Sequence, residues 1–177
     1  MMVDKKHVFE YLVYRLDEWR NQLDCSLDGP FSKLRLQKIL FLVCASKATV
    51  EDKKLLNIYN RFFALPYGPV EMDIYEAMKM TSAFRYLHFY GNDCEYDKMD
   101  DSMFEDIPKN ERMWIDEAIQ MFKKDGRLYL TMSVFDLVEI THKWTVWKNS
   151  MSIARALGHK QFEMMSDDIC ESSTKSF

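Results

Sequence analysis

The chain has 177 residues, of which 47% are hydrophobic and 14% aromatic, and its formal net charge at pH 7 is −4. These totals exclude a disordered chain, because disorder combines low hydrophobicity with high net charge, and they fit one domain with a sizeable core. The sequence contains no block of Lys and Arg that could neutralise a run of phosphates, which disfavours nucleic acid as a partner.

The cysteines and the hydropathy pattern exclude two further classes of protein. Cys25, Cys44, Cys94 and Cys170 lie far apart without a CxxC pair, so a structural zinc site and a disulfide framework are not expected. The longest apolar run, residues 39–45, is far shorter than the roughly 20 residues that span a bilayer. We therefore expect a cytoplasmic protein with reduced thiols and no membrane segment.

The first half of the chain predicts two main helices. Residues 4–24 carry apolar side chains at helical spacing: Val8, Leu12, Leu16, Trp19 and Leu23. Ser32 is a suitable N-cap for a second helix over residues 33–48, which is apolar on nearly all sides and is expected at the centre of the core. Arg35 and Lys38, three residues apart, are expected to form its one polar ridge.

The middle of the chain is less regular. A short helix is expected near residues 50–56, and residues 57–65 favour a strand or an extended connector. Gly68 is expected to supply an unusual backbone angle, and Pro69 to begin a helix. Residues 83–90 could form another strand.

The second half predicts several shorter helices. Residues 93–106 contain seven acids and one lysine and are expected as a solvated loop. A helix is predicted over residues 108–124, ended by Gly126. Ser133 should cap the next helix, and two short helices are expected over residues 151–157 and 159–165.

These elements predict a mainly α fold. We expect a compact single-domain helical bundle around one central buried helix, with room for one short β-hairpin or extended segments. Residues 1–165 would form the domain, and residues 166–177 a polar C-terminal tail.

Three segments, in this order, resemble the Panacea domain, a family that includes SocA-like antitoxins and GepA-like phage-associated proteins. The first is Leu-Arg-Leu-Gln-Lys-Ile-Leu-Phe at residues 34–41. The second is Tyr-Gly-Pro-Val at residues 67–70, followed by Tyr75. The third is Leu-Val-Glu-Ile-Thr-His at residues 137–142, followed by Trp147.

The resemblance implies an antitoxin-like protein that neutralises a cognate toxin by binding it. In SocA-type members this role extends to handing the toxin to a processive protease. The expected partner is therefore a protein, and neither a cofactor nor a metal ion is implied. Candidate partner-binding residues are Arg35, Lys38, Tyr67, Gly68, Pro69, His142, Trp144 and Trp147.

Each of these candidates also has a purely structural interpretation. Gly68 and Pro69 could serve turn chemistry alone, with Tyr67 as an aromatic contact only in the functional interpretation. His142 could make a local hydrogen bond at a helix end. Trp144 and Trp147 would share one side of a helix, as a core anchor or as a contact patch.

Two alternative functions stay open on the sequence alone. Helices around residues 133–157 could form a helix-turn-helix in a DNA-binding regulator of a toxin–antitoxin or phage-derived locus, with Lys143, Lys148 and Arg155 near phosphates. An uncharacterised enzyme would need a perturbed Cys44 or His142 in a cleft. We expect no enzyme, because no nucleophile has a nearby base or an oxyanion hole in the sequence pattern.

Overall fold

The computed structural model describes residues 2–23 and 29–172. Within them the helices, in chain order, are α1 (Lys5–Gln22), α2 (Lys33–Ala45), the 3-10 helix η1 (Lys54–Asn57), α3 (Met72–Met78), the 3-10 helix η2 (Asp101–Phe104), α4 (Lys109–Lys124), α5 (Val134–His142), α6 (Thr145–Ala156) and α7 (Ser166–Glu171). The strands are β1 (Phe31–Ser32), β2 (Phe62–Leu65), β3 (Gly68–Glu71), β4 (Leu87–Tyr90), β5 (Asp93–Tyr96) and β6 (Phe162–Met164).

The predicted fold class, a mainly α bundle with at most one hairpin, is wrong. The chain is an α/β protein, with 54% of the described residues in helices and 13% in strands. The strands form two three-stranded antiparallel sheets, in the orders β1-β5-β4 and β3-β2-β6. Each strand has only two to four residues, so few positions show the apolar–polar alternation by which strands are recognised.

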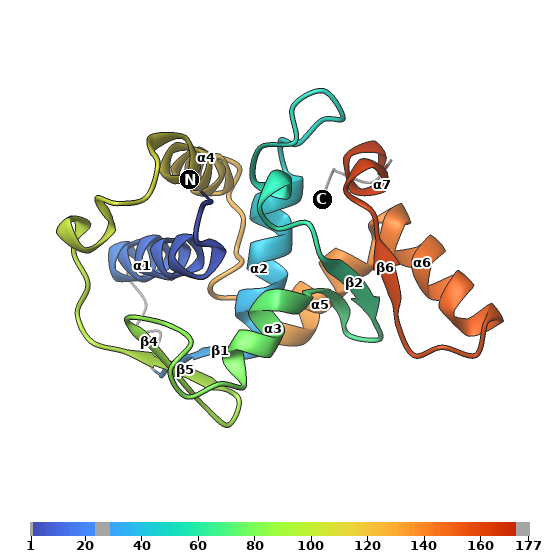
Figure 1. The fold of residues 1–177 in the computed structure, drawn as a ribbon, viewed down its shortest axis with the longest axis horizontal. Coiled ribbons are helices and arrows are strands. Elements are labelled where there is room, and N and C mark those ends of the chain that lie inside the picture. Colours follow the sequence, from blue (N-terminus) through green and yellow to red (C-terminus); the bar gives the residue numbers. More distant parts are fainter. Residues whose placement is uncertain (1, 24–28, 173–177) are drawn as a thin grey trace.

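The central position of α2 is confirmed. Residues 36–45 are buried, and α2 packs against α1, α4, α5 and β3. In Figure 1, α2 stands between two groups of elements, with α1, α4 and the first sheet on one side and the second sheet, α6 and α7 on the other. The predicted polar ridge is wrong at Lys38, which is fully buried. The N-cap is confirmed, because Ser32 Oγ accepts a hydrogen bond from Arg35 N at 3.1 Å.

The predicted helix start at Pro69 is also wrong. Pro69 lies within β3, opposite Ala64 of β2, and α3 begins three residues later at Met72. The helix begins there because the Glu71 carboxylate accepts hydrogen bonds from the backbone N–H groups of Asp73 and Ile74. Residues 69–71, which the sequence predicts as the start of the helix, therefore belong to the β2–β3 hairpin.

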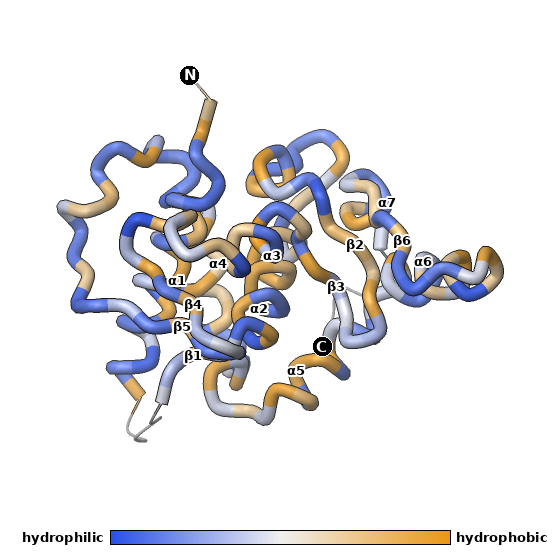
Figure 2. The backbone as a smooth tube through the Cα atoms, turned by 60° about the horizontal axis from the view of Figure 1, so that its bottom comes forward, coloured by the Kyte–Doolittle hydropathy of each residue, from blue (hydrophilic) through white to orange (hydrophobic). Residues whose placement is uncertain are grey.

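The acidic segment is more ordered than the expected solvated loop. Its first residues form β5, and Asp101–Phe104 form η2. Cys94 and Phe104 are buried, which explains why this otherwise acidic stretch is held against the core. Figure 2 shows the long connection between β5 and α4 as mostly hydrophilic, whereas hydrophobic residues gather nearer the centre of the molecule.

The C-terminal third departs from prediction in three places. α6 begins at Thr145, six residues before the helix expected at residue 151, and the helix expected over residues 159–165 is instead the strand β6. The segment expected as a tail begins with α7, whose Ile169 and Cys170 are buried. Residues 173–177 lie outside the described part, and the division at residue 165 stays a prediction. None of the described helices has both the length and the apolar character needed to cross a membrane.

Candidate functional site

The turn between β2 and β3 is the point at which side chains from three helices meet. β2 and β3 pair antiparallel from Phe62 opposite Glu71 to Leu65 opposite Gly68, so Pro66 and Tyr67 form the tip. The residues that fix this turn come from α2, α5 and α6.

The side chain of Gln37 closes the outer edge of β3. Its Oε1 accepts a hydrogen bond from Glu71 N at 2.9 Å, and its Nε2 donates one to Glu71 O at 3.3 Å. The amide thus pairs with both backbone polar groups of one residue, as a neighbouring strand would do. Both residues are buried, so the side chain of Gln37 supplies hydrogen bonds that water cannot supply to these backbone groups of the edge strand.

Lys38, the next residue on α2, contacts β3 at Pro69, which lies two residues closer to the tip than Glu71. Its Nζ donates a hydrogen bond to Pro69 O at 2.5 Å, and the side chain is completely buried. Burial lowers the pKa of Lys38 to about 7, and no acidic group among the described residues offsets that effect. A fully buried lysine without a carboxylate is unusual, because desolvating an ammonium is costly. The hydrogen bond fixes the backbone of β3 at Pro69.

Gly68 brings the turn into direct contact with α5. Its φ is +102°, a backbone conformation that side chains disfavour. A Cβ atom at this position would lie 2.6 Å from Thr141 Oγ1 and 3.1 Å from Lys38 Cε. Thr141 is itself fixed, since its hydroxyl donates to Val138 O at 2.7 Å. Only glycine allows the strand to approach α2 and α5 this closely.

Trp147 and His142 hold the other side of the tip. Trp147 Nε1 donates a hydrogen bond to Leu65 O at 2.9 Å. The His142 ring stacks on the Trp147 ring with 3.8 Å between centroids and 12° between planes. Burial is the main cause that lowers the pKa of His142, although Glu139 and the backbone of Pro66 favour its charged form. The ring is therefore largely neutral at pH 7, in keeping with stacking on an aromatic face.

Tyr67 is the one predicted site residue that the turn presents to solvent. Its exposed fraction is 64%, whereas Gly68 and Pro69 behind it are buried. Hydrogen bonds hold the backbone at Leu65 and Pro69, two residues to either side of Tyr67. A side chain on such a turn loses little backbone freedom on binding, which favours it as a contact residue.

The remaining predicted residues support the core. Trp144 is 1% exposed and packs edge-on against Phe41, with ring centroids 5.2 Å apart. It therefore does not form a surface patch with Trp147, which is itself only 8% exposed. Arg35 donates to the carbonyls of Tyr129 and Met132 at 2.6 and 2.7 Å, and so fixes the connection from α4 to α5.

Replacing Arg35 by lysine is expected to lower the free energy of unfolding by about 1–2 kcal/mol, because a single ammonium cannot reproduce the two-pronged contact with both carbonyls. Urea denaturation followed by tryptophan fluorescence measures the change. Arg155→Lys on the exposed face of α6 is the matched control and should change stability by less than about 0.5 kcal/mol. Equal effects of the two variants would contradict the role given to Arg35.

Sequence reasoning missed two members of this site, Gln37 and Glu71. Glu71 is fully buried, caps α3 and forms an ion pair with Lys5 of α1 at 2.7 Å between Nζ and Oε1. Burial raises the pKa of Glu71, while Lys5 opposes the shift. A signal for Gln37 was present, since it is a polar residue within the most apolar helix, but its partner in β3 could not be identified from spacing.

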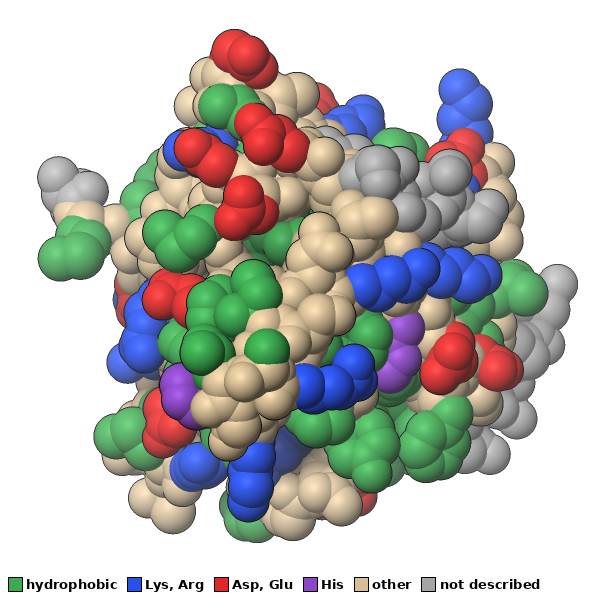
Figure 3. Space-filling view, turned by 90° about the vertical axis from the view of Figure 1, so that its right-hand side faces the viewer, with side chains coloured by type: hydrophobic (Ala, Val, Ile, Leu, Met, Phe, Trp, Pro, Cys, Tyr) green, Lys and Arg blue, Asp and Glu red, His purple; other side chains and the backbone are tan. Residues whose placement is uncertain are grey.

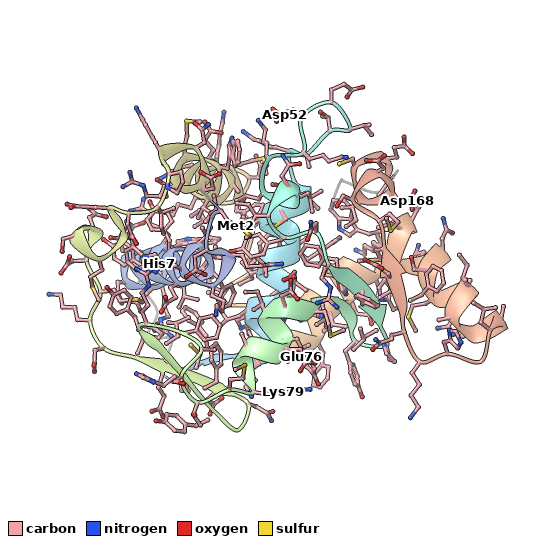
Figure 4. All side chains as sticks on the ribbon, in the orientation of Figure 1. Met2, His7, Asp52, Glu76, Lys79 and Asp168 are labelled. Atoms are coloured by element: carbon pink, nitrogen blue, oxygen red, sulfur yellow. The ribbon has the colours of Figure 1, made fainter. Side chains whose placement is uncertain are left out.

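A second cluster ties α1 to the connection before α4. His7 Nδ1 lies 3.1 Å from Glu10 Oε1, and its Nε2 lies 3.0 Å from Asp106 Oδ1. Burial opposes protonation, but the two carboxylates prevail and raise the pKa of His7. Figure 4 shows Met2 near this residue at the start of α1. Since both ring nitrogens are engaged, His7 is not free to act as a base or ligand.

The groups named for an enzymatic role lie in unsuitable surroundings. Cys44 is 2% exposed, and burial raises the pKa of its thiol well above the ordinary value, which disfavours the nucleophilic thiolate. His142 stacks on the Trp147 ring. Among the described residues, no group of three or more His, Cys, Asp or Glu is placed to hold a metal ion.

Comparisons with known proteins agree with the arrangement of the three segments. A family model described as antitoxin SocA-like, Panacea domain, matches residues 36–148. These residues include Gln37, Lys38, Thr141 and Trp147, whose side chains contact the β2–β3 hairpin. Searches of the curated proteins and of the solved structures gave no significant match.

Proposed function

The chain belongs to the family of SocA-like antitoxins with a Panacea domain, and on that premise we propose that it binds and neutralises a cognate protein toxin. The observation that carries this proposal is the placement of Tyr67. Lys38 and Trp147, which lie within the residues matched by the family model, hold the backbone on both sides of this turn, and Tyr67 between them is exposed. Tyrosine on a rigid support is typical of protein interfaces.

The face around the hairpin and α6 suits a protein partner better than DNA. Figure 3 shows this end of the molecule, where hydrophobic side chains are interspersed with Lys and Arg, and acidic side chains share the same face. A duplex would require a continuous positive surface. We therefore expect this protein to cause no shift of duplex DNA in a gel at low salt. A salt-sensitive shift would instead support the alternative function, a DNA-binding regulator.

A co-expression experiment tests the proposal. The open reading frame beside the gene is placed under a tight promoter and expressed alone or with this chain. We expect growth arrest alone, and both growth and co-purification when the two are expressed together. A steady, protease-dependent loss of the toxin would identify the adaptor form of the role. A harmless neighbour that does not bind would contradict the antitoxin role.

Replacing Tyr67 by alanine is expected to abolish neutralisation while changing the free energy of unfolding by less than about 0.5 kcal/mol, because the side chain is exposed and its backbone is held by other residues. The co-expression growth assay and thermal unfolding measure the two effects. Tyr90→Ala is the matched control, since Tyr90 is 62% exposed but lies on the other sheet. Neutralisation by the Tyr67 variant at the wild-type level would remove Tyr67 from the interface.

A further inference from the structure

A groove opens between the start of α2, helix α3 and the turn that joins β4 to β5. Its volume is about 260 Å³. Leu34 and the small exposed parts of the buried Val70 and Met78 form its apolar floor, and Tyr75, Lys33 and Lys79 are among the other lining residues. It lies apart from the Tyr67 tip, although Val70 belongs to the same hairpin.

Positive charge dominates the lining of the groove. The lining includes Lys33 and Lys79 but no acidic residue. Lys79 Nζ lies 4.2 Å from the centre of the Tyr75 ring, and its one carboxylate neighbour among the described residues is the exposed Glu76 at 3.5 Å. Figure 4 shows Glu76 and Lys79 together on the outer side of α3.

Lys33 is still less neutralised. Its ammonium lies 6.0 Å from the centre of the Phe89 ring, and no carboxylate of the described residues lies within 4.0 Å of it. Lys33 is also the first residue of α2, so the positive end of that helix adds to the local field. An anionic group entering the groove would meet Lys33, which has no carboxylate within 4.0 Å among the described residues, and Lys79, whose carboxylate partner Glu76 is exposed and lies outside the lining.

We infer that this groove binds a short acidic segment of a protein partner, with one apolar side chain inserted between Leu34, Val70 and Met78 and carboxylates placed at Lys33 and Lys79. The inference rests on the proposed protein-binding function and names the chemistry that the partner presents. Complementary charge sets the orientation of such a segment, and the apolar insertion contributes most of the affinity.

The composition of the groove favours a peptide over nucleic acid. Two lysines over an apolar surface can neutralise two carboxylates, whereas nucleic-acid binding draws on many cations along a backbone. An aliphatic side chain is the group that gains from contact with a leucine, a valine and a methionine. The Tyr75 ring and the aliphatic parts of Lys33 and Lys79 lie beside this surface and would cover such a side chain on binding.

Selection from a displayed library of random twelve-residue peptides tests the inference. The selected peptides are then synthesised, and their Kd values are measured by fluorescence anisotropy against three forms of the full chain. The forms are wild type, Lys33→Glu with Lys79→Glu, and the matched control Lys109→Glu with Lys124→Glu on α4. The four lysines lie at or near the surface, and unchanged melting temperatures would show that each form is folded. If the double variant Lys33→Glu with Lys79→Glu is unfolded, the double variant Lys33→Gln with Lys79→Gln is used in its place.

The expected result is enrichment of Asp and Glu around one apolar residue, with binding at least tenfold weaker in the groove variant and unchanged in the control. Raising the salt concentration from 50 to 500 mM should weaken binding to the wild type. A peptide with its acids replaced by lysines should bind the charge-reversed variant better than the wild type.

Three outcomes would overturn the inference. They are no selected binder, binders without acidic enrichment, and equal affinity for the groove and control variants. The readout is peptide affinity rather than rescue of growth. A failure here would therefore leave the antitoxin proposal standing, and a failed rescue would leave the peptide result interpretable.

Discussion

Gly68→Ala is expected to lower the free energy of unfolding by about 3 kcal/mol, the sum of backbone strain at positive φ and overpacking of a full site. The new methyl group would lie 2.6 Å from Thr141 Oγ1, far inside a normal contact, and 3.1 Å from Lys38 Cε. Thr141 cannot yield cheaply, because its hydroxyl donates to Val138 O inside α5. Gly68→Val should cost more, since a branched side chain adds a second clash.

The chain contains a control that separates strain from crowding. Gly29 has φ of +99°, close to the +102° of Gly68, but a Cβ atom there would meet nothing within 4 Å. Gly29→Ala should therefore cost only the backbone part, about 1 kcal/mol. Urea denaturation of both variants gives the difference. Equal losses would show that crowding by Thr141 and Lys38 adds nothing to the backbone cost at Gly68.

The free energy of unfolding is expected to rise between pH 7 and pH 8.5, by up to about 2 kcal/mol from Lys38 alone. The pKa of Lys38 is about 7 in the folded protein, against an ordinary pKa of 10.5 for lysine. Between these values the unfolded chain binds a proton that the folded chain does not, so raising the pH favours folding. The same contribution is lost as the pH falls through 7.

Lys38→Met isolates this effect. The variant removes the titrating group while keeping an unbranched side chain in the core, so the rise with pH should become smaller by the Lys38 contribution. His7, whose pKa is raised, opposes the rise in both proteins and cancels in the comparison. The measurement stops at pH 8.5 because burial raises the pKa values of Cys44 and Tyr59, which reverses the trend in alkali. Lys124→Met, on the surface of α4, should leave the slope unchanged.

A rise with pH that is identical in Lys38→Met and wild type would show that Lys38 is charged or hydrated in the folded protein. If the predicted difference is found, the buried amine carries a stability cost at neutral pH. That cost is consistent with a functional position for the hydrogen bond to Pro69 O, since core polar groups retained at a cost tend to fix one arrangement. The arrangement fixed here is the turn that presents Tyr67.

The local properties of the sequence determined the long elements. Helical spacing located α1 and α4, continuous apolar character located α2 in the core, and the caps at Ser32 and Ser133 were read correctly. These features depend on residues within about one turn of one another, which is the range over which spacing and capping act. The resemblance also placed the three segments in one family, as the match over residues 36–148 bears out.

The tertiary structure decided the sheets and the roles of the site residues. β1 pairs with β5, and β2 pairs with β6, between residues 61 to 102 positions apart in the chain. Such short strands are stable only when a distant partner supplies their hydrogen bonds. The roles of Gln37, Lys38 and Trp147 also depend on the tertiary structure, because their hydrogen-bond partners are backbone groups of β2 and β3. A backbone carbonyl has no signature in sequence, so spacing alone could not reveal that these side chains face inward and leave Tyr67 exposed.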